Sequence, residues 1–172
     1  MKIGIAGTGA MAGRFLTAVK DKVDNVVFTA ACDVLEEQRR KLKQKYPTME
    51  VFSDYDEMLK SDIDAVYICT PVSTHVELTL KAARAGKHVL CEKPMALDIG
   101  ECQKMIDAHK KSGTILQIGY MMRFHPIHQY IKRQISSGEL GNIQYIHVER
   151  TAFIDFKAID IPRHRLWFVQ KE

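Results

Sequence analysis

Short apolar runs alternate with segments of helical period from residue 3 to residue 118, and this alternation limits the possible folds more than any other feature. The runs are almost continuously apolar, which is typical of strands that are buried on both faces. Such strands, separated by helices, predict an α/β fold with a parallel sheet between two layers of helices. The predicted strands are residues 3–6, 26–32, 50–52, 65–69, 88–91 and 115–118.

The segments between the apolar runs carry the end signals of helices. Thr74 and Glu77 have the spacing of a capping box, and Asp98 and Glu101 have the same spacing with an aspartate. Gly113 follows a helical segment, where glycine commonly adopts the left-handed conformation that ends a helix. The predicted helices are residues 10–20, 35–45, 54–60, 74–85 and 98–111.

The pattern changes after Gly119. Residues 126–137 predict one more helix, and residues 143–153 alternate apolar and polar side chains as a half-buried antiparallel strand does. No element is predicted from Ile154 onward. We therefore divide the chain into a doubly wound parallel-sheet domain, residues 1–120, and the beginning of an incomplete second α/β domain, residues 121–172.

Composition argues against several classes of function. The net charge is +4, and the basic residues are dispersed except for a group that suits the solvated face of a helix, Arg39, Arg40, Lys41, Lys43 and Lys45. A nucleic-acid-binding surface needs a stronger basic stripe. No apolar stretch approaches the roughly 20 residues that span a bilayer, and the N-terminus carries no secretory signal. The four cysteines lack metal-ligand spacing. We expect a cytoplasmic protein with reduced thiols and no metal, membrane or nucleic-acid partner.

The first predicted strand runs into a glycine-rich loop with the pattern G-x-G-x-x-A, which contains Gly7, Thr8, Gly9, Ala10 and Met11. The first glycine permits a tight turn, and the second lets a pyrophosphate approach the backbone. The N-terminus of the following helix offers amide groups and a positive dipole to phosphates. The strand before the loop and the helix after it strengthen the prediction that these five residues bind a dinucleotide.

Asp33 ends the second predicted strand, about 20 residues beyond the glycine loop. An acidic residue at this position typically accepts hydrogen bonds from the adenosine ribose of a dinucleotide. A carboxylate also repels a 2′-phosphate, so the sequence favours NAD over NADP. Two alternatives stay open: Asp33 could cap the next helix, and the nearby Arg39 and Arg40 could accommodate a 2′-phosphate.

Two further loops follow predicted strands, and the carboxyl ends of parallel strands are where open α/β sheets bind ligands. One contains Thr70, Pro71 and His75, and the other contains Glu92 and Lys93. We expect these residues near the nicotinamide end of a bound dinucleotide, with Lys93 suited to acid–base chemistry on an alcohol or carbonyl. The alternative is that Glu92 and Lys93 are solvated surface residues and His75 belongs to the first turn of a helix.

These loops resemble the Gfo/Idh/MocA family of oxidoreductases. The resemblance rests on C-T-P and its histidine at residues 69–75, on G-K-H-V-L-C-E-K-P at residues 86–94, and on residues 119–126 and 138–141. It covers about residues 2–153. It implies an N-terminal Rossmann domain, a C-terminal domain on a mostly antiparallel sheet, and hydride transfer between nicotinamide and a hydroxyl-bearing carbon of a sugar, cyclitol or related polyol.

The resemblance also implies roles for single residues. Lys93 corresponds to an active-site lysine that helps proton transfer, and Glu92 to a glutamate beside the nicotinamide ribose. Arg123 and His125 correspond to a segment near the catalytic cleft, so Arg123 is included among the candidate cofactor contacts. The acidic residue and histidine that the family's second domain normally supplies have no counterpart here, so we expect a cofactor-binding fragment or a short relative.

Other readings of the sequence remain. A stand-alone dinucleotide-sensing regulatory domain explains the glycine loop and Asp33 but gives no reason for Glu92 and Lys93. A methyltransferase-like protein fits less well, because nothing else suits a methyl donor. The predicted strand at residues 143–153 lacks a partner, so we expect it either to pair with a second molecule in a homo-oligomer or to be removable by a protease.

Overall fold

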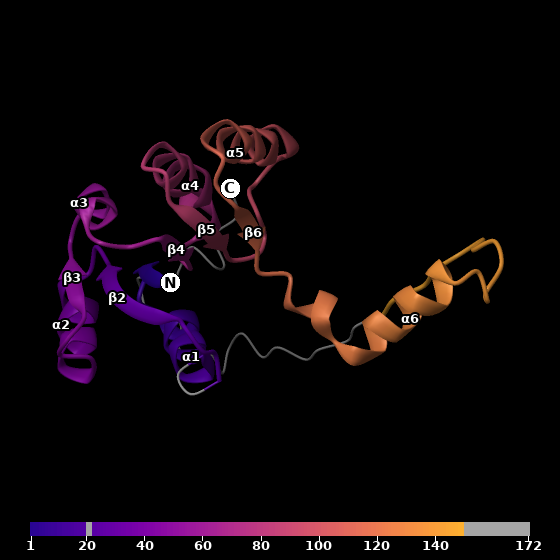
Figure 1. Ribbon diagram of the computed structural model, residues 1–172, viewed down its shortest axis with the longest axis horizontal. Coiled ribbons are helices and arrows are strands. Elements are labelled where there is room, and N and C mark those ends of the chain that lie inside the picture. The colour runs from indigo at the N-terminus through magenta and orange to yellow at the C-terminus, as the bar shows by residue number, and fades with distance from the viewer. Residues whose placement is uncertain (20–21, 150–172) are drawn as a thin grey trace, which may run out of the picture. The chain divides into compact units, whose positions relative to one another are not determined.

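Six parallel strands form the sheet that the apolar runs predict. The computed structural model describes residues 1–19 and 22–149. The strands are paired in the order β3-β2-β1-β4-β5-β6 (Figure 1). This is a doubly wound Rossmann-type sheet, as expected. Their bounds are β1 Lys2–Ala6, β2 Val27–Cys32, β3 Glu50–Phe52, β4 Ala65–Ile68, β5 His88–Cys91 and β6 Leu116–Ile118.

The strand order reverses beside β1, which lies between β2 and β4. The connections that follow β1 and β2 lead to β2 and β3 on one side of this point. The connections that follow β4 and β5 lead to β5 and β6 on the other side. Ligands of open α/β sheets bind at such a switch point, beyond the carboxyl ends of the strands. The fold therefore places the glycine loop, Asp33 and the loops after β4 and β5 along one edge.

Helices cover both faces of the sheet (Figure 1). One face packs against α3, α4 and α5 through a core that includes Met58, Ala82 and Met105, and the other packs against α1 and α2 through Leu16 and Leu42. The bounds are α1 Ala10–Val19, α2 Glu36–Lys45, α3 Tyr55–Lys60, α4 His75–Arg84 and α5 Ile99–Ser112. The predicted helices all form, with ends that differ by a residue or so; Lys20 lies outside the described residues.

One of the two predicted caps forms and the other does not, although the Glu101 carboxylate accepts from the Leu97 amide and not from the Asp98 amide that a full capping box requires. The Asp98 carboxylate accepts a hydrogen bond from the amide of Glu101 at 2.8 Å, and α5 ends at Gly113 with φ of 70°. The prediction for Thr74 was wrong. Its hydroxyl donates to the Pro71 carbonyl at 2.8 Å, because a 3₁₀ turn, η1 Val72–Thr74, precedes α4 and directs the side chain backward.

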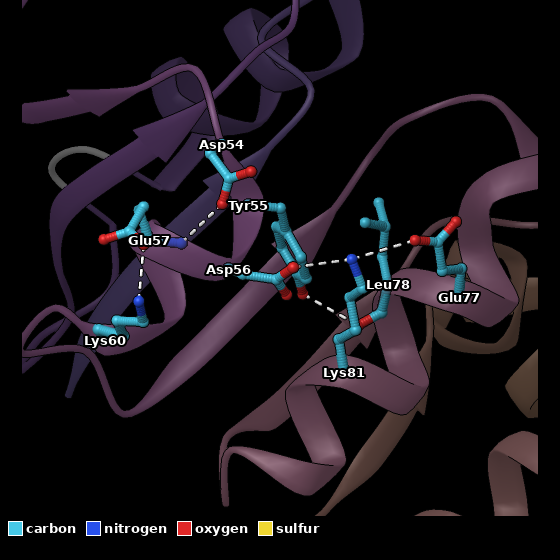
Figure 2. Close-up of polar contacts among 8 residues, drawn as sticks. All are labelled: Asp54, Tyr55, Asp56, Glu57, Lys60, Glu77, Leu78 and Lys81. Carbon is cyan, nitrogen blue, oxygen red and sulfur yellow. Dashed lines mark hydrogen bonds and ion pairs between the residues drawn. The ribbon is translucent and has the colours of Figure 1, made fainter.

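Side-chain contacts join α3 to α4 on one face of the sheet (Figure 2). Asp54 caps α3 by accepting from the amide of Glu57 at 2.9 Å. The buried Tyr55 then donates its hydroxyl to the Leu78 carbonyl of α4 at 3.1 Å. Lys81 adds an ion pair with Asp56 at 2.9 Å, but such exposed pairs contribute little. The hydrogen bond from the buried tyrosine is therefore the stronger link between the two helices.

The chain divides after Tyr120 into a second compact unit that starts at Met121. Its described part contains a 3₁₀ turn, η2 Met121–Phe124, and the helix α6 Pro126–Ser136, which agrees with the predicted helix. The strand predicted at residues 143–153 is not found in its described part: residues 143–149 carry no strand and are exposed. A strand is stabilised only by a partner, and the described residues supply none there. Residues 150–153 lie outside the described residues.

The Asp98 cap can be tested by substitution. Asp98→Ala removes the acceptor that satisfies the Glu101 amide, so we expect a loss of about 1 kcal/mol in the free energy of unfolding. Asp107→Ala is the control, because Asp107 lies exposed in the middle of the same helix and caps nothing. Denaturant unfolding of the three proteins measures the difference. Equal stabilities would contradict the cap.

Candidate dinucleotide-binding site

Two glycines of the loop after β1 differ in what surrounds them. Gly7 has φ of +83°, and a Cβ placed on it would lie 2.9 Å from the Thr70 side chain and 3.0 Å from the Cys69 carbonyl. A Cβ placed on Gly9 would meet no atom of the described residues within 4 Å. The close packing at Gly7 fixes the turn, and the open space at Gly9 leaves room for a phosphate to approach the backbone. The loop therefore fits the pyrophosphate of a dinucleotide.

Helix α1 begins at Ala10, directly after that open space. The amides of a first helical turn have no partners within the helix, and they lie at the positive end of its dipole. Ala12 is buried where α1 packs on the sheet, which matches the requirement for a small side chain at this position of the motif. Met11 is exposed on the same turn. Phosphate oxygens over Gly9 would thus meet unpaired N–H groups of Ala10 and Met11.

Asp33 and Thr8 form a hydrogen-bonded pair across the ends of β1 and β2. Asp33 Oδ2 accepts from both the amide and the hydroxyl of Thr8, each at 2.8 Å. Asp33 Oδ1 accepts from the amide of Leu35 at 2.9 Å. Thr8 therefore shapes the loop through Asp33, and its amide is already occupied. Oδ1 retains a lone pair for a ribose hydroxyl.

Arg39 lies beside this aspartate. Its Nη1 donates to the carbonyl of Asp33 at 2.8 Å and to that of Val34 at 3.0 Å. Arg39 and Arg40 also line an open groove of about 520 Å³ between α2 and β3. The guanidinium of Arg39 is thus held by backbone carbonyls close to the position that decides between a ribose hydroxyl and a 2′-phosphate.

His75 joins the two loops on the other side of the switch point. Its side chain is 1% exposed. Nε2 lies 3.0 Å from the Thr70 carbonyl oxygen, and Nδ1 lies 2.9 Å from the Pro94 carbonyl oxygen. The burial of His75 means that it holds the loops together rather than facing the ligand edge.

Glu92 and Lys93 follow β5 at the same edge of the sheet. Glu92 Oε1 accepts from the Tyr67 hydroxyl at 2.7 Å, and Oε2 accepts from the Lys93 amide at 3.2 Å. The Lys93 side chain is exposed, and among the described residues its Nζ makes no hydrogen bond or ion pair. The carboxylate is therefore oriented by the protein, while the amine has no partner among the described residues.

Arg123 belongs to η2 in the second unit. It lines a groove of about 420 Å³ together with Phe124 of the same turn and with residues of α6, among them Lys132 and Arg133. Its role as a cofactor contact stays a prediction. His125, from the same segment, caps α6: its Nδ1 accepts from the amide of Ile127 at 3.3 Å.

Two residues at the site were missed by the sequence reasoning. Tyr67 orients Glu92, and the Cys69 thiol donates to the Gly7 carbonyl at 2.8 Å. Burial raises the pKa of Cys69, so the thiol stays protonated and keeps this bond to the glycine loop. A tyrosine inside an apolar strand was an available signal, because its buried hydroxyl needs a partner.

The described residues hold no cluster of three or more potential metal-ligating side chains. Among their helices, none combines the length and the apolar character needed to cross a membrane.

Comparisons with known proteins agree with this geometry. A family model described as an oxidoreductase family with an NAD-binding Rossmann fold, Gfo/Idh/MocA, matches residues 1–120. The chain belongs to this family of oxidoreductases.

Individual relatives are dehydrogenases. The myo-inositol 2-dehydrogenase of Thermotoga maritima is 29% identical over 181 residues, which cover 96% of this chain and 54% of that enzyme. The 4-carboxy-2-hydroxymuconate-6-semialdehyde dehydrogenase of a Sphingobium species is 33% identical over 174 residues, covering 97% of this chain and 55% of that enzyme. The chain therefore spans about half the length of the curated relatives it matches.

Solved structures show the same relation. The crystal structure of scyllo-inositol dehydrogenase from Lactobacillus casei, with bound NAD(H) and scyllo-inositol, superposes with a TM-score of 0.75 at 33% identity. The match covers 83% of this chain and 42% of that one. The similarity thus extends over the sheet that carries the candidate site.

Proposed function

We propose that this chain is the cofactor-binding half of an NAD-dependent dehydrogenase. In the proposed reaction a hydride moves between nicotinamide and a hydroxyl-bearing carbon of a sugar, cyclitol or related polyol. The observation that carries the proposal is the arrangement along one sheet edge. The glycine loop and Asp33 lie on one side of the switch point, and Glu92 and Lys93 lie on the other.

Each part of the edge has a separate task in this proposal. The backbone at Gly9 and the first turn of α1 bind the pyrophosphate, and Asp33, held by Thr8, accepts from the adenosine ribose. Thr70 and Pro71 form the loop beside the nicotinamide end, and buried His75 fixes that loop against Pro94. When bound, the dinucleotide supplies the site that accepts or returns a hydride.

Lys93 is the proposed proton carrier. Its free Nζ takes the hydroxyl proton as an alcohol becomes a carbonyl and returns it in the reverse direction. Glu92 stays fixed beside it and accepts a hydrogen bond from a ribose hydroxyl. A regulatory domain that only senses a dinucleotide would have no use for the Lys93 amine. The inositol dehydrogenases among the relatives support a polyol substrate, whereas the semialdehyde dehydrogenase shows that related chains also act on other carbonyl compounds.

Residues 1–120 are the proposed cofactor domain, and residues 121–172 begin the second domain, which includes Arg123. The described part of this second unit exposes many apolar side chains, which is unusual for a surface that stays in water. We propose that a homo-oligomer forms through this C-terminal segment. The exposed residues include Phe124, Ile127, Tyr130, Ile131, Ile146 and Val148.

Cofactor preference follows from the charge of Asp33. We expect NADH to bind more tightly than NADPH in calorimetric titrations, because the carboxylate repels a 2′-phosphate. Asp33→Ala weakens NADH binding and reduces the difference in affinity between NADH and NADPH. Asp33→Asn keeps an acceptor oxygen for Thr8 while removing the charge. It therefore reduces the difference in affinity between NADH and NADPH and disturbs the conformation of the glycine loop less. Equal or tighter binding of NADPH by the unaltered chain would refute the argument.

The role of Lys93 is tested in a protein that turns over substrate and contains this domain. Lys93→Ala lowers kcat by about 10²–10⁴-fold, the usual contribution of a general acid–base group, while the dissociation constant of NADH changes far less. Lys104→Ala, which removes an exposed lysine of α5, is the matched control and leaves both quantities unchanged. Near-normal turnover by the Lys93 variant would exclude proton transfer through this residue.

Assembly through the C-terminal segment is measured by light scattering and limited proteolysis. We expect the chain to form a dimer or a larger assembly. A version that ends at Gly141 should form an assembly with fewer subunits and keep its sheet folded. The reason is that the described residues after Gly141, 142–149, expose apolar side chains. A protease-resistant monomer of the full chain would contradict this proposal.

A further inference from the structure

Tyr67 and Glu92 meet although they lie on different strands. The pairing of β4 with β5 sets Tyr67 opposite Leu90, and Glu92 follows two residues later on the same face of the sheet. The Tyr67 hydroxyl donates to Glu92 Oε1 at 2.7 Å. This bond connects the buried interior of the sheet with the edge where the candidate site lies.

The tyrosine ring cannot easily move away from this partner. It is 2% exposed. Its centroid lies 4.1 Å from that of Phe15, which projects from α1 and in turn contacts Phe28 edge-to-face at 5.9 Å. Burial and the hydrogen bond to Glu92 both raise the pKa of Tyr67, so its hydroxyl remains a donor over the whole physiological range.

The remaining surroundings of Glu92 hold its carboxylate in one orientation. Oε2 accepts from the Lys93 amide at 3.2 Å. A Cβ at position 119 would lie 3.6 Å from Oε1 and from the carboxyl carbon, at van der Waals contact, so the carboxylate lies against the backbone of Gly119. A carboxylate offers about four acceptor positions, and these contacts occupy one on each oxygen. The others remain for a ligand.

We propose that Tyr67 is a positioning residue. It orients Glu92 to accept a hydrogen bond from a hydroxyl of the ribose next to nicotinamide. The inference rests on the proposed function. A dinucleotide that crosses the switch point with its adenosine ribose at Asp33 brings its second ribose toward β4 and β5, where Glu92 lies. An acceptor oriented in advance binds more tightly, because little freedom is lost when the ligand arrives.

The variant Tyr67→Phe removes the hydroxyl alone. We expect the dissociation constant of NADH to rise by about three- to tenfold, the net scale of one ordinary hydrogen bond. The dissociation constant of ADP should stay unchanged, because ADP carries the pyrophosphate and the adenosine ribose but not the second ribose. If the variant instead disturbed the packing of α1 through Phe15, the binding of NADH and of ADP would weaken equally. That outcome would overturn the proposal.

Tyr55→Phe is the matched control. Tyr55 is also buried, and its hydroxyl donates to the Leu78 carbonyl on the face of the sheet that packs against α3 and α4 (Figure 2). Both variants lose one buried hydrogen bond, so we expect both to lower the unfolding temperature. Only Tyr67→Phe should weaken NADH. A similar loss of NADH affinity in the control would also overturn the proposal.

A double-mutant cycle tests whether Tyr67 acts through Glu92. Glu92→Ala should weaken NADH and leave ADP unchanged, and adding Tyr67→Phe to it should have no further effect on NADH. Additive losses would show that the tyrosine acts independently of the glutamate, contrary to the proposal. If the unaltered chain bound ADP and NADH with equal affinity, the second ribose would have no binding site and both proposals would fail at that point. If it bound NADH more tightly and only the tyrosine variant had no effect, the proposed function would stand and this inference would fall.

Discussion

The backbone pairing of β1 between β2 and β4 is the constraint on which the rest of the structure depends. β1 is buried against both neighbours, and its carboxyl end is the point where the strand order changes direction. Gly7 donates its amide to the Cys32 carbonyl at 2.9 Å, and the Cys69 amide donates to the Ala6 carbonyl at 2.9 Å. These bonds carry the ladder past the ends of the strands. The glycine loop is thereby attached to both sides of the candidate site.

The sequence was a good guide where the signal was local and repeated. A buried parallel strand such as β4 is apolar at every position, and helix α5 carries both a capping aspartate and a terminal glycine. These signals lie within a few residues of the element that they mark. They predicted the six strands, the helices on both faces and the edge at which the candidate site lies.

The sequence was a poor guide where a side chain has several partners to choose from. Thr74 has the spacing of a capping residue, but the 3₁₀ turn offers its hydroxyl the Pro71 carbonyl instead. The contact between Tyr67 and Glu92 depends on the register of two strands that are separated by a whole helix. The alternating pattern over residues 143–149 forms no strand for a related reason, since a strand exists only with a neighbour and the pattern does not say where the neighbour lies.

The two glycines of the loop are required for different reasons, so natural selection keeps each of them on different grounds. Gly7 is required by the polypeptide itself, since both its backbone angle and its contacts with Thr70 and Cys69 exclude a side chain. A side chain at Gly9 would meet none of the described residues, so the requirement for a glycine there comes from the ligand that we propose for this site. A descendant that ceased to bind a nucleotide could exchange Gly9 by neutral drift while keeping Gly7. The pair would then serve as an evolutionary marker that distinguishes loss of the ligand from loss of the fold.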